Sequence, residues 1–436
     1  MQLDLHYKSF SPTLLEEIGK FATSTNIDEE ISKSVVEILD DVKDKGDQAL
    51  LERTLLYDKA NLNKSELRVP HEEIKKATTL LSSEQRYAIN DAIENVTLFH
   101  QQNLPRDWKS FNSHGALVGE NYYPLDRVGL YVPGGNVPLV STVIMTATLA
   151  KVAGVAQIAV TTPPNPNCKI SPELLAALGI LEIEEVYKVG GAHAIGALGY
   201  GTETIPSVDK IFGPGNAYVN EAKRQVFGNA GIDLLPGPSE VMVIADDSSN
   251  SSYIAAALIA QAEHGSGKEK IYLVFTKENQ FEEIISEITR QASELSHKES
   301  ILQIFLKGFF ATHVKDLDEA ICVANYVAPE HLELQVKEEN ISYLQSNIKT
   351  AGALLLGHFS ATALGDFVAG PSHVLPTGRS SRFSSGLRIE DFFRRTSIIK
   401  YDEESIKNAS KSALLFSEME KLDGHGKSIS IRLGQE

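Results

Sequence analysis

The stretch RVGLYVPGGN, residues 127–136, decides the fold class of this chain of 436 residues. Residues 128–132 form a short apolar run that we expect to be a strand, and a turn of proline and glycine ends it. A segment rich in Ala, Val and Thr follows, with the pattern of a helix. The same order of strand, turn and helix recurs along the chain, with expected strands at 157–161, 185–189 and 210–212. Strands that alternate with helices predict a parallel α/β sheet.

The pattern restarts after Gly237, where expected strands at 241–245 and 270–275 flank a helix at 251–263, and a further strand lies at 352–356. We therefore predict an α/β fold of two incomplete Rossmann-like α/β domains side by side, with a helical N-terminal part and a small C-terminal arm domain. The predicted boundaries are an N-terminal segment at 1–24, a discontinuous first α/β domain at 25–130 plus 239–380, a second α/β domain at 131–238, and the arm at 381–436.

The composition limits the class of partner. Lysine and arginine total 41 and aspartate and glutamate total 58, so the formal net charge is −17. So acidic a chain is not expected to bind nucleic acid or an anionic membrane, and it fits an enzyme that acts on small molecules. The two cysteines, Cys168 and Cys322, lie far apart without CxxC spacing, which argues against a disulfide scaffold or a cysteine-based zinc site. Neither a signal peptide nor a membrane span is predicted, so we expect a cytoplasmic protein.

Three glycine-containing turns follow expected strands of the same sheet, namely PGG at 133–135, GGA at 190–192 and GPG at 213–215. A Rossmann fingerprint needs a third glycine after such a turn, and Tyr218 stands in its place, so the full fingerprint is absent. The helix expected after the last turn has free N–H groups that can receive a phosphate or a ribose hydroxyl, whereas the alternative is an ordinary turn. Three such loops at one sheet edge favour a ligand-binding crevice.

Side chains that can bind a metal stand in three later segments. Gln261 and His264 are three residues apart at a helix end, so both can face one metal ion such as zinc; the alternative is a capped helix end. Asp366 follows a glycine ahead of a Gly-Pro turn, which suits a metal ligand or a plain turn aspartate. His425 lies between two glycines, with Glu420 nearby, and is a ligand or an exposed loop residue.

The adjacent residues Glu330 and His331 are candidates for proton transfer. They follow Pro329, a residue favoured in the first turn of helices, so we expect the pair at a helix N-terminus that is exposed to a cleft. A carboxylate beside an imidazole can provide two proton-transfer groups that point in different directions. The alternative is an ordinary N-terminal acid beside a surface histidine.

Taken in order from about Asp47 to the C-terminus, these motifs resemble those of the L-histidinol dehydrogenase family. The matching segments are GLYVPGG (129–135), KIFGPGN (210–216), GPSE (237–240), QAEHG (261–265), APEHLE (328–333), GD (365–366), HVLPT (373–377) and FSSG (383–386). Because several long and independent motifs match, the resemblance is highly specific.

The resemblance implies an enzyme that oxidises L-histidinol to L-histidine through an aldehyde with two NAD⁺, the last step of histidine biosynthesis. It also implies a homodimer with one Zn²⁺ per subunit, held by an oxygen and nitrogen ligand set that zinc accepts. The metal ligands would be Gln261, His264, Asp366 and His425, and an exchanged C-terminal arm would bring His425 of the partner subunit. The discontinuous first domain would hold the catalytic and metal-binding residues, and the second domain would contact NAD⁺.

The resemblance also implies roles in catalysis and substrate binding. His331 would remove the hydroxyl proton and serve again as base in the second oxidation, while Glu330 would activate the water that hydrates the aldehyde. The implied substrate-binding set is Ser239, Gln261, His264, Glu330, His331, Asp366, Glu420 and His425. The metal would orient the substrate rather than activate water.

By the same resemblance, NAD⁺ would contact Tyr131, His193 and Asn216. The chain departs from the family pattern at two places. His193 stands where the family usually has glutamine, and a histidine can become charged near pH 6–7, so the affinity for NAD⁺ is expected to change or to depend on pH. The segment between Gln225 and Gly237 is shortened and has Pro236 where alanine is common. We expect this change to alter how the two α/β units are arranged relative to each other.

Three other functions fit parts of the sequence. A related NAD-dependent alcohol dehydrogenase on the same scaffold would oxidise another hydroxymethyl substrate, although Glu420 and His425 favour recognition of an imidazole and an amine. A zinc hydrolase would use Glu330 to activate water, but it would leave the nucleotide-facing loops unexplained. A non-catalytic nucleotide-binding protein would leave the pair of Glu330 and His331 without a role.

Overall fold

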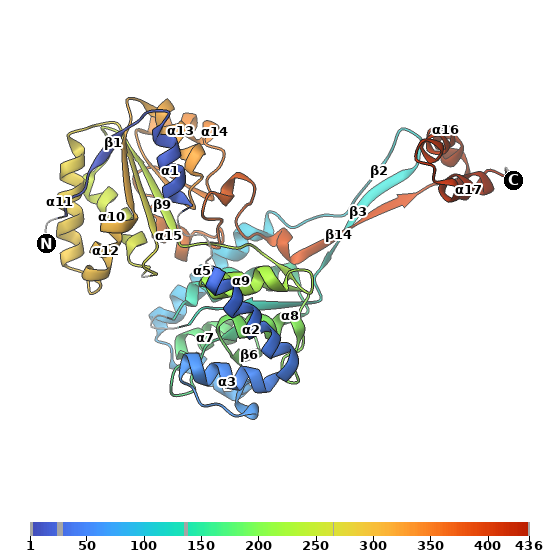
Figure 1. The fold of residues 1–436 in the computed structure, drawn as a ribbon, viewed down its shortest axis with the longest axis horizontal. Helices are drawn as coiled ribbons and strands as arrows, with labels where there is room; N and C mark the ends of the chain where they lie inside the picture. Colours follow the sequence, from blue (N-terminus) through green and yellow to red (C-terminus); the bar gives the residue numbers. More distant parts are fainter. Residues whose placement is uncertain (1–2, 24–28, 135–137, 265, 435–436) are drawn as a thin grey trace.

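The computed structural model describes residues 3–23, 29–134, 138–264 and 266–434. Two bodies, each a parallel sheet covered by helices, lie side by side, and a long arm projects from one of them (Figure 1). The predicted α/β fold with two sheets is therefore confirmed. In the described part of the chain, no helix combines the length and the apolar character needed to cross a membrane.

The first body is built on a sheet of six parallel strands in the order β1-β11-β10-β9-β12-β13. The strands are β1 (Tyr7–Ser9), β9 (Glu240–Ala245), β10 (Lys270–Phe275), β11 (Phe309–His313), β12 (His331–Gln335) and β13 (Ala353–Leu356). Side chains of a strand alternate between the two faces. In β9, Val241 and Val243 pack on one face with α10 (Ser251–Ala262), α11 (Gln280–Ser293) and α12 (Lys298–Gly308). Met242 and Ile244 pack on the other face with α1 (Leu14–Ala22), α13 (Leu317–Val327) and α14 (Glu338–Asn347).

The second body is built on a sheet of five parallel strands in the order β6-β5-β4-β7-β8. The strands are β4 (Arg127–Tyr131), β5 (Gln157–Thr162), β6 (Glu185–Lys188), β7 (Lys210–Phe212) and β8 (Gly231–Ile232). One core joins the sheet to α4 (His71–Leu80), α5 (Ser83–Gln101), α6 (Val140–Ala153) and α7 (Pro172–Ile180). Another core joins it to α2 (Glu29–Lys45), α3 (Asp47–Asp58), α8 (Gly191–Tyr200) and α9 (Ala217–Val226).

The N-terminal helices pack on a different sheet from the one that the predicted domain boundaries imply. The prediction grouped residues 25–130 with 239–380, whereas helices α2 to α5 pack on the five-stranded sheet. The residues of β1 and α1, predicted as a separate segment, join the six-stranded sheet and its core. The apolar face of α2 shows the reason: Leu39 and Val42 fit against α8 at Gly196, where an added Cβ would lie 3.0 Å from Leu39. The sequence indicates that this helix has an apolar face but not which sheet the face covers.

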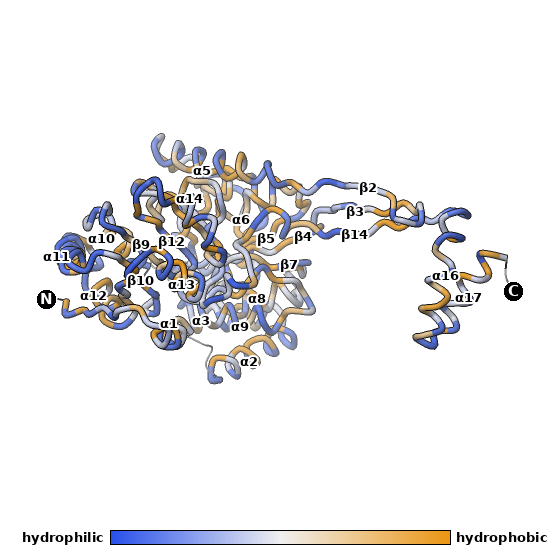
Figure 2. Tube along the Cα trace, turned by 90° about the horizontal axis from the view of Figure 1, so that it is seen from above, coloured by the Kyte–Doolittle hydropathy of each residue, from blue (hydrophilic) through white to orange (hydrophobic). Residues whose placement is uncertain are grey.

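The arm combines two distant parts of the chain. Its antiparallel sheet has the order β14-β3-β2, formed by β2 (Trp108–Phe111), β3 (Leu117–Pro124) and β14 (Phe393–Lys400). The helices α16 (Glu403–Met419) and α17 (Asp423–Arg432) lie at its far end, and the view from above shows the same projection (Figure 2). The predicted arm at 381–436 therefore lacks the hairpin of β2 and β3. Short 3₁₀ turns lie at Lys64–Glu66, Ser380–Arg382 and Ile389–Phe392.

Candidate active site

Glu330 and His331 lie at the start of β12, at the amino end of the six-stranded sheet. The predicted helix N-terminus is wrong, because α13 ends at Val327 and the strand begins at His331. Ala328 ends the helix in the left-handed conformation at φ 52°, and Pro329, which cannot donate a backbone hydrogen bond, follows it. Both side chains of the pair are buried, with 6% and 5% of their surface exposed, rather than open to a cleft.

The third member of this cluster is Asp366, which lies on the short helix α15 (Thr362–Phe367) after β13. His331 Nε2 is 3.4 Å from Asp366 Oδ1, and His331 Nδ1 is 3.8 Å from Glu330 Oε2. The backbone N–H of Glu240, on the neighbouring strand β9, donates to Glu330 Oε2 at 2.7 Å. The imidazole therefore lies between two carboxylates that come from different elements.

Burial and charge shift the proton affinities of this cluster. Burial raises the pKa of Glu330 to about 7. Burial disfavours the charged form of His331, but the carboxylates of Glu330 and Asp366 outweigh it and raise the pKa of His331 to about 9. Burial also disfavours the charged form of Asp366, yet the hydrogen bond from His331 and the nearby histidines hold the pKa of Asp366 below its usual value. A carboxyl group with a pKa near neutrality is suited to accept and return a proton.

Gln261 and His264 lie at the end of α10 near the same cluster. Gln261 is 2% exposed, and neither its amide oxygen nor its amide nitrogen has a hydrogen-bond partner in the described protein. Such a buried pair of polar atoms is costly unless a ligand or ion meets it. His264 is exposed, and it lies close enough to Glu330 and Asp366 to lower the pKa of both carboxyl groups. Gly265, the last residue of this motif, lies outside the described residues.

Glu420 and His425 lie far from this cluster. Glu420 follows α16 and His425 is in the first turn of α17, at the far end of the arm (Figure 1). Among the described residues, no group of three or more His, Cys, Asp or Glu side chains is placed to hold a metal ion. The structure thus brings Gln261, His264 and Asp366 to one region and leaves His425 apart from them.

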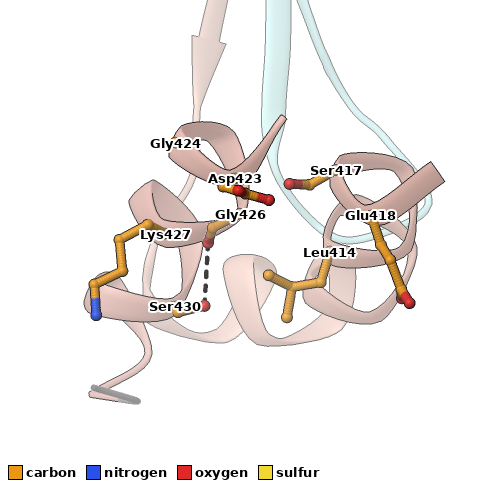
Figure 3. Close-up of a pocket in the computed structure, with 8 residues that line it drawn as sticks. All are labelled: Leu414, Ser417, Glu418, Asp423, Gly424, Gly426, Lys427 and Ser430. Atoms are coloured by element: carbon orange, nitrogen blue, oxygen red, sulfur yellow. Dashed lines mark hydrogen bonds between the residues drawn. The ribbon is translucent and has the colours of Figure 1, made fainter. Parts of the chain in front are cut away.

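The glycines beside His425 have different surroundings. An added Cβ at Gly426 would lie 2.7 Å from Ser417 Oγ of α16, whereas one at Gly424 would meet nothing within 4 Å. Figure 3 shows Gly426 and Ser417 beside a hollow of about 780 Å³ between α16 and α17. Helix packing therefore explains Gly426, a reason that the sequence did not reveal.

The three predicted NAD⁺ contacts gather at the carboxyl end of the five-stranded sheet. Tyr131 ends β4, His193 is in the first turn of α8 after β6, and Asn216 caps α9 after β7. The Tyr131 hydroxyl accepts from the N–H of Gly191 at 3.2 Å, and burial raises the pKa of Tyr131 to about 12. A pocket of about 320 Å³ opens at this edge and is lined by Asp58, Gly134, Thr162 and Pro163, among others. Of the three glycine loops from which a crevice was predicted, the first lines this pocket through Gly134, whereas no residue of 190–192 or 213–215 does. Gly135 lies outside the described residues.

The surroundings of His193 and Asn216 differ from what the sequence predicted. His193 is 1% exposed, its Nε2 lies 3.3 Å from Thr54 Oγ1, and its Nδ1 is buried with no partner in the described protein. Burial lowers the pKa of His193 to about 3, so this ring does not become charged near pH 6–7. Asn216 Oδ1 accepts from the N–H groups of Tyr218 and Val219 at 3.0 and 3.1 Å. The N–H groups that were expected to be free for a phosphate are therefore capped by the protein itself.

Two residues near the catalytic pair received no role from the sequence. Glu240 is 2% exposed beside Glu330, and its Oε1 accepts from the N–H of Gly378 at 3.1 Å. Burial and the charge of Glu330 raise the pKa of Glu240 to about 8. His373 has a buried Nε2 without a partner in the described protein, and burial lowers its pKa. Each stands in a matched motif, GPSE or HVLPT, which was the available signal.

Comparisons with known proteins agree with this arrangement. The model of the histidinol dehydrogenase family matches residues 22–433. The histidinol dehydrogenase of Geobacter sulfurreducens is 42% identical over 406 residues, which cover 93% of this chain and 94% of that protein. That of Nitrosomonas europaea is 40% identical over 419 residues and 96% of each chain. A crystal structure of histidinol dehydrogenase from Elizabethkingia anophelis superposes with a TM-score of 0.93 at 33% identity, covering 98% of this chain and 97% of that one.

The two α/β bodies and these matches define an NAD-dependent oxidoreductase that acts on a CH–OH group. The match spans nearly the whole chain, including Glu330 and His331, the glycine loops and the arm. The chain belongs to the histidinol dehydrogenase family. The resemblance drawn from the sequence motifs is therefore confirmed.

Proposed function

We propose that this enzyme catalyses the zinc-dependent, four-electron oxidation of L-histidinol to L-histidine through L-histidinal, with two NAD⁺, as the last step of histidine biosynthesis. The observation that carries the proposal is the buried imidazole of His331 between the carboxylates of Glu330 and Asp366. An alcohol oxidation needs a base for the hydroxyl proton, and hydration of the aldehyde needs a second one. We assign the two adjacent groups Glu330 and His331 to these steps. Because the pKa of His331 is raised to about 9, its imidazole accepts a proton only in the deprotonated fraction of the molecules, which grows as the pH rises.

The buried donor atoms near this pair support a zinc site. Gln261 offers two amide atoms without a hydrogen-bond partner in the described protein, and Asp366 and His264 could add a carboxylate and an imidazole. Oxygen and nitrogen donors of this kind suit zinc. We assign Gln261, His264 and Asp366 as ligands from one chain, with His425 of the partner subunit completing the set. A bound zinc would orient the imidazole and the amine of the substrate.

The chain's own residues would carry out the proton transfers. His331 would accept the hydroxyl proton of histidinol in the first oxidation, for which bound NAD⁺ would supply the hydride acceptor, and the aldehyde would result. Glu330 would accept a proton from the water that adds to the aldehyde carbon, and His331 would return its proton to the aldehyde oxygen, which would give the hydrate. In the second oxidation His331 would accept a hydroxyl proton of the hydrate, and the resulting carboxylic acid would lose its proton to give the carboxylate of histidine. The burial of Glu330 and His331 excludes bulk water during these steps.

The carboxyl edge of the five-stranded sheet is the proposed NAD⁺ site. Tyr131 ends β4, His193 follows β6 and Asn216 follows β7, all at this edge of the sheet. The pocket of about 320 Å³ lies at the same edge, where Thr162 ends β5. The Tyr131 hydroxyl proton, the buried His193 Nδ1 and the Asn216 amide nitrogen are polar groups that a nucleotide could meet. Ser239 precedes β9 next to Glu240, whose N–H donates to Glu330 Oε2, and we assign Ser239 to the substrate site on that ground.

A second copy of the chain is the proposed partner. The arm exposes apolar side chains on every one of its elements, including Phe111, Ile399, Phe416, Met419 and Ile431. Exposed apolar surface of this extent is typical of an interface. We propose a homodimer in which each arm is exchanged, so that Glu420 and His425 of the partner subunit reach the catalytic cluster. Both cysteines are free, which fits a reducing compartment, and we place the enzyme in the cytoplasm.

The direct test is an assay of purified protein with zinc, NAD⁺ and L-histidinol, followed by absorbance of NADH and by product analysis. We expect two NADH and one histidine for each histidinol. No NADH from histidinol, but NADH from another hydroxymethyl compound, would instead identify the related alcohol dehydrogenase. Hydrolysis of an ester or amide without NADH would identify the zinc hydrolase.

A further inference from the structure

We infer that Lys223 and Asp233 form a buried clamp that positions the loop at residues 213–216 and thereby sets the affinity for NAD⁺. The inference rests on the proposed function, in which Asn216 of this loop contacts NAD⁺. The loop joins the end of β7 to the start of α9. Neither Lys223 nor Asp233 belongs to the candidate catalytic, metal-binding or substrate-binding residues.

The ion pair holds both backbone polar groups of one loop residue. The N–H of Gly213 donates to Asp233 Oδ2 at 2.8 Å, and Lys223 Nζ donates to the carbonyl oxygen of Gly213 at 2.9 Å. Lys223 Nζ also donates to Asp233 Oδ1, which closes the ring of contacts. The two side chains are 0% and 1% exposed, so these charge-assisted bonds are not weakened by solvent.

The clamp is anchored in regular structure on both sides. Asp233 directly follows β8, and its N–H donates to the carbonyl of Ile211 in β7 at 3.1 Å. Lys223 is in α9, whose first turn begins at the loop itself. Asn220 of the same helix also binds the loop, because its side-chain nitrogen donates a hydrogen bond to the carbonyl oxygen of Gly215 at 3.0 Å. The loop is thus fixed at both of its glycines by the elements that flank it.

The clamped loop lies directly against the proposed cofactor edge. Gly213 has φ +114°, and an added Cβ would lie 2.1 Å from the carbonyl oxygen of Tyr131. The loop therefore packs on the backbone of the strand that carries Tyr131. Asn216 uses its side-chain oxygen to cap α9, which leaves its amide nitrogen to meet a ligand. A shift of the loop would move this nitrogen relative to Tyr131 and lower the fraction of molecules that are ready to bind NAD⁺.

Stability alone is a weak explanation for this pair. Burial of two charges carries a desolvation cost, so a buried ion pair often stabilises a protein no more than apolar residues of similar volume. Here both charged groups bond, besides each other, the backbone of one loop residue, Gly213. We therefore treat Lys223 and Asp233 as positioning residues.

The test compares two altered proteins with a matched control. The double variant Lys223→Met with Asp233→Asn removes both charges, so neither is left buried and unpaired. The variant Asn220→Ala loosens the other end of the loop without changing any charge. The control is Arg224→Met on the same helix, because Arg224 is 54% exposed and pairs with Glu221 instead of the loop. For each protein we would measure the Kd of NAD⁺ by calorimetry, the KM of NAD⁺ and of histidinol, and hydrogen exchange of residues 213–216.

We expect the Kd and KM of NAD⁺ to rise about tenfold in both loop variants, which corresponds to ~1.4 kcal/mol of binding free energy. Hydrogen exchange of the loop should become faster, while the KM of histidinol and all values of the control stay unchanged. Unchanged NAD⁺ affinity and unchanged loop exchange in folded variants would overturn the inference. If the double variant does not fold, the NAD⁺ affinity and the loop hydrogen exchange of Asn220→Ala alone test the inference.

The proposed function and the clamp can fail separately. If the unaltered protein does not bind NAD⁺, the proposed cofactor site is wrong, and the affinity part of the inference falls with it. Hydrogen exchange of the loop needs no NAD⁺ and still decides the positioning part. If the unaltered protein binds NAD⁺ and the loop variants bind it equally well, the clamp alone is refuted.

Discussion

The Nε2 atom of His331 lies 3.4 Å from Oδ1 of Asp366, and the two residues come from a central strand and from a short helix after the next strand. The other ring nitrogen faces Glu330 at 3.8 Å. One imidazole therefore connects the proposed water-activating carboxylate to a proposed metal ligand. His331 contacts both a proposed catalytic residue and a proposed metal ligand, so its replacement is the most informative.

We predict that His331→Asn will abolish NADH formation from histidinol while zinc stays bound. Asparagine can occupy the site but cannot accept a proton, and general-base catalysis typically contributes about 10²–10⁴-fold to a rate. The measurements are NADH absorbance and the zinc content after dialysis. His297→Asn, a replacement of an exposed histidine before α12, is the control and should keep full activity. Unchanged turnover in His331→Asn would remove this residue from the mechanism.

Gln261→Leu should stabilise the metal-free protein and remove its response to zinc. Both amide atoms of Gln261 are buried and have no partner among the described residues, and each unsatisfied polar group costs about 1–3 kcal/mol. Leucine has a similar volume and no polar atoms, so we expect a gain of about 1–3 kcal/mol in the free energy of unfolding without metal. Zinc should raise the Tm of the unaltered protein but not that of the variant. A metal-free variant that is less stable, or that still responds to zinc, would contradict the assignment of Gln261 as a ligand.

His193 should not make the affinity for NAD⁺ depend on pH between about 5 and 8, because burial lowers its pKa to about 3 and the folded protein keeps it neutral. The unfolded chain has an ordinary histidine there, which binds a proton below about pH 6.5. The unfolded state then binds more protons than the folded state, so acid lowers the stability.

The variant His193→Gln removes this effect. We expect its stability relative to the unaltered protein to improve by about 2 kcal/mol from pH 7 to pH 5. Urea unfolding at both pH values measures the change, and calorimetric titration with NAD⁺ measures the affinity. An NAD⁺ affinity that falls steeply near pH 6.5 in the unaltered protein, but not in His193→Gln, would show that the ring does become charged.

Gly426→Ala and Gly424→Ala are a matched pair of variants that tests whether the packing of α17 on α16 positions His425. The first adds a methyl group 2.7 Å from Ser417 Oγ, whereas the second adds one in open space. We expect Gly426→Ala to push α17 away from α16 and to weaken zinc binding about tenfold, and Gly424→Ala to leave zinc binding unchanged. Adding Ser417→Ala to Gly426→Ala removes the clashing oxygen and should restore the affinity. Equal effects of the two glycine variants would mean that helix packing does not position His425.

Mixing two inactive variants tests the exchange of arms between subunits. A heterodimer of His331→Asn and His425→Ala subunits has one site with both defects and one site with none, if each arm serves the partner. Random reassociation should therefore recover about a quarter of the activity of the unaltered enzyme, since half of the dimers are mixed and half of their sites are intact. Mass spectrometry of the intact dimers confirms the mixing. No recovered activity in a sample with mixed dimers would place His425 in its own subunit's site or outside the site.

Local sequence patterns predicted β4, β5, β6 and β7 of one sheet and β9, β10 and β13 of the other, but not β8, β1, β11 or β12. The strand expected at 270–275 is found at the same residues, and the one expected at 241–245 differs from β9 by one residue. These strands are continuous apolar runs between turn residues, a pattern set by burial on both faces. The pair of Glu330 and His331 was misplaced on a helix because Pro329 is equally compatible with the residue before a strand. What decides between the two is the position of β12 between β9 and β13, a contact between distant segments.

The sequence by itself determined the fold class and the family motifs, and it supplied the candidate site residues, because periodicity and residue type are local properties. The tertiary structure decided which of them meet. It placed Asp366 beside His331, buried His193 against Thr54 so that the ring stays neutral, and put His425 at the end of an arm far from the catalytic cluster. Distances, burial and pKa shifts depend on the packing of segments that are distant in the chain. No local pattern encodes them.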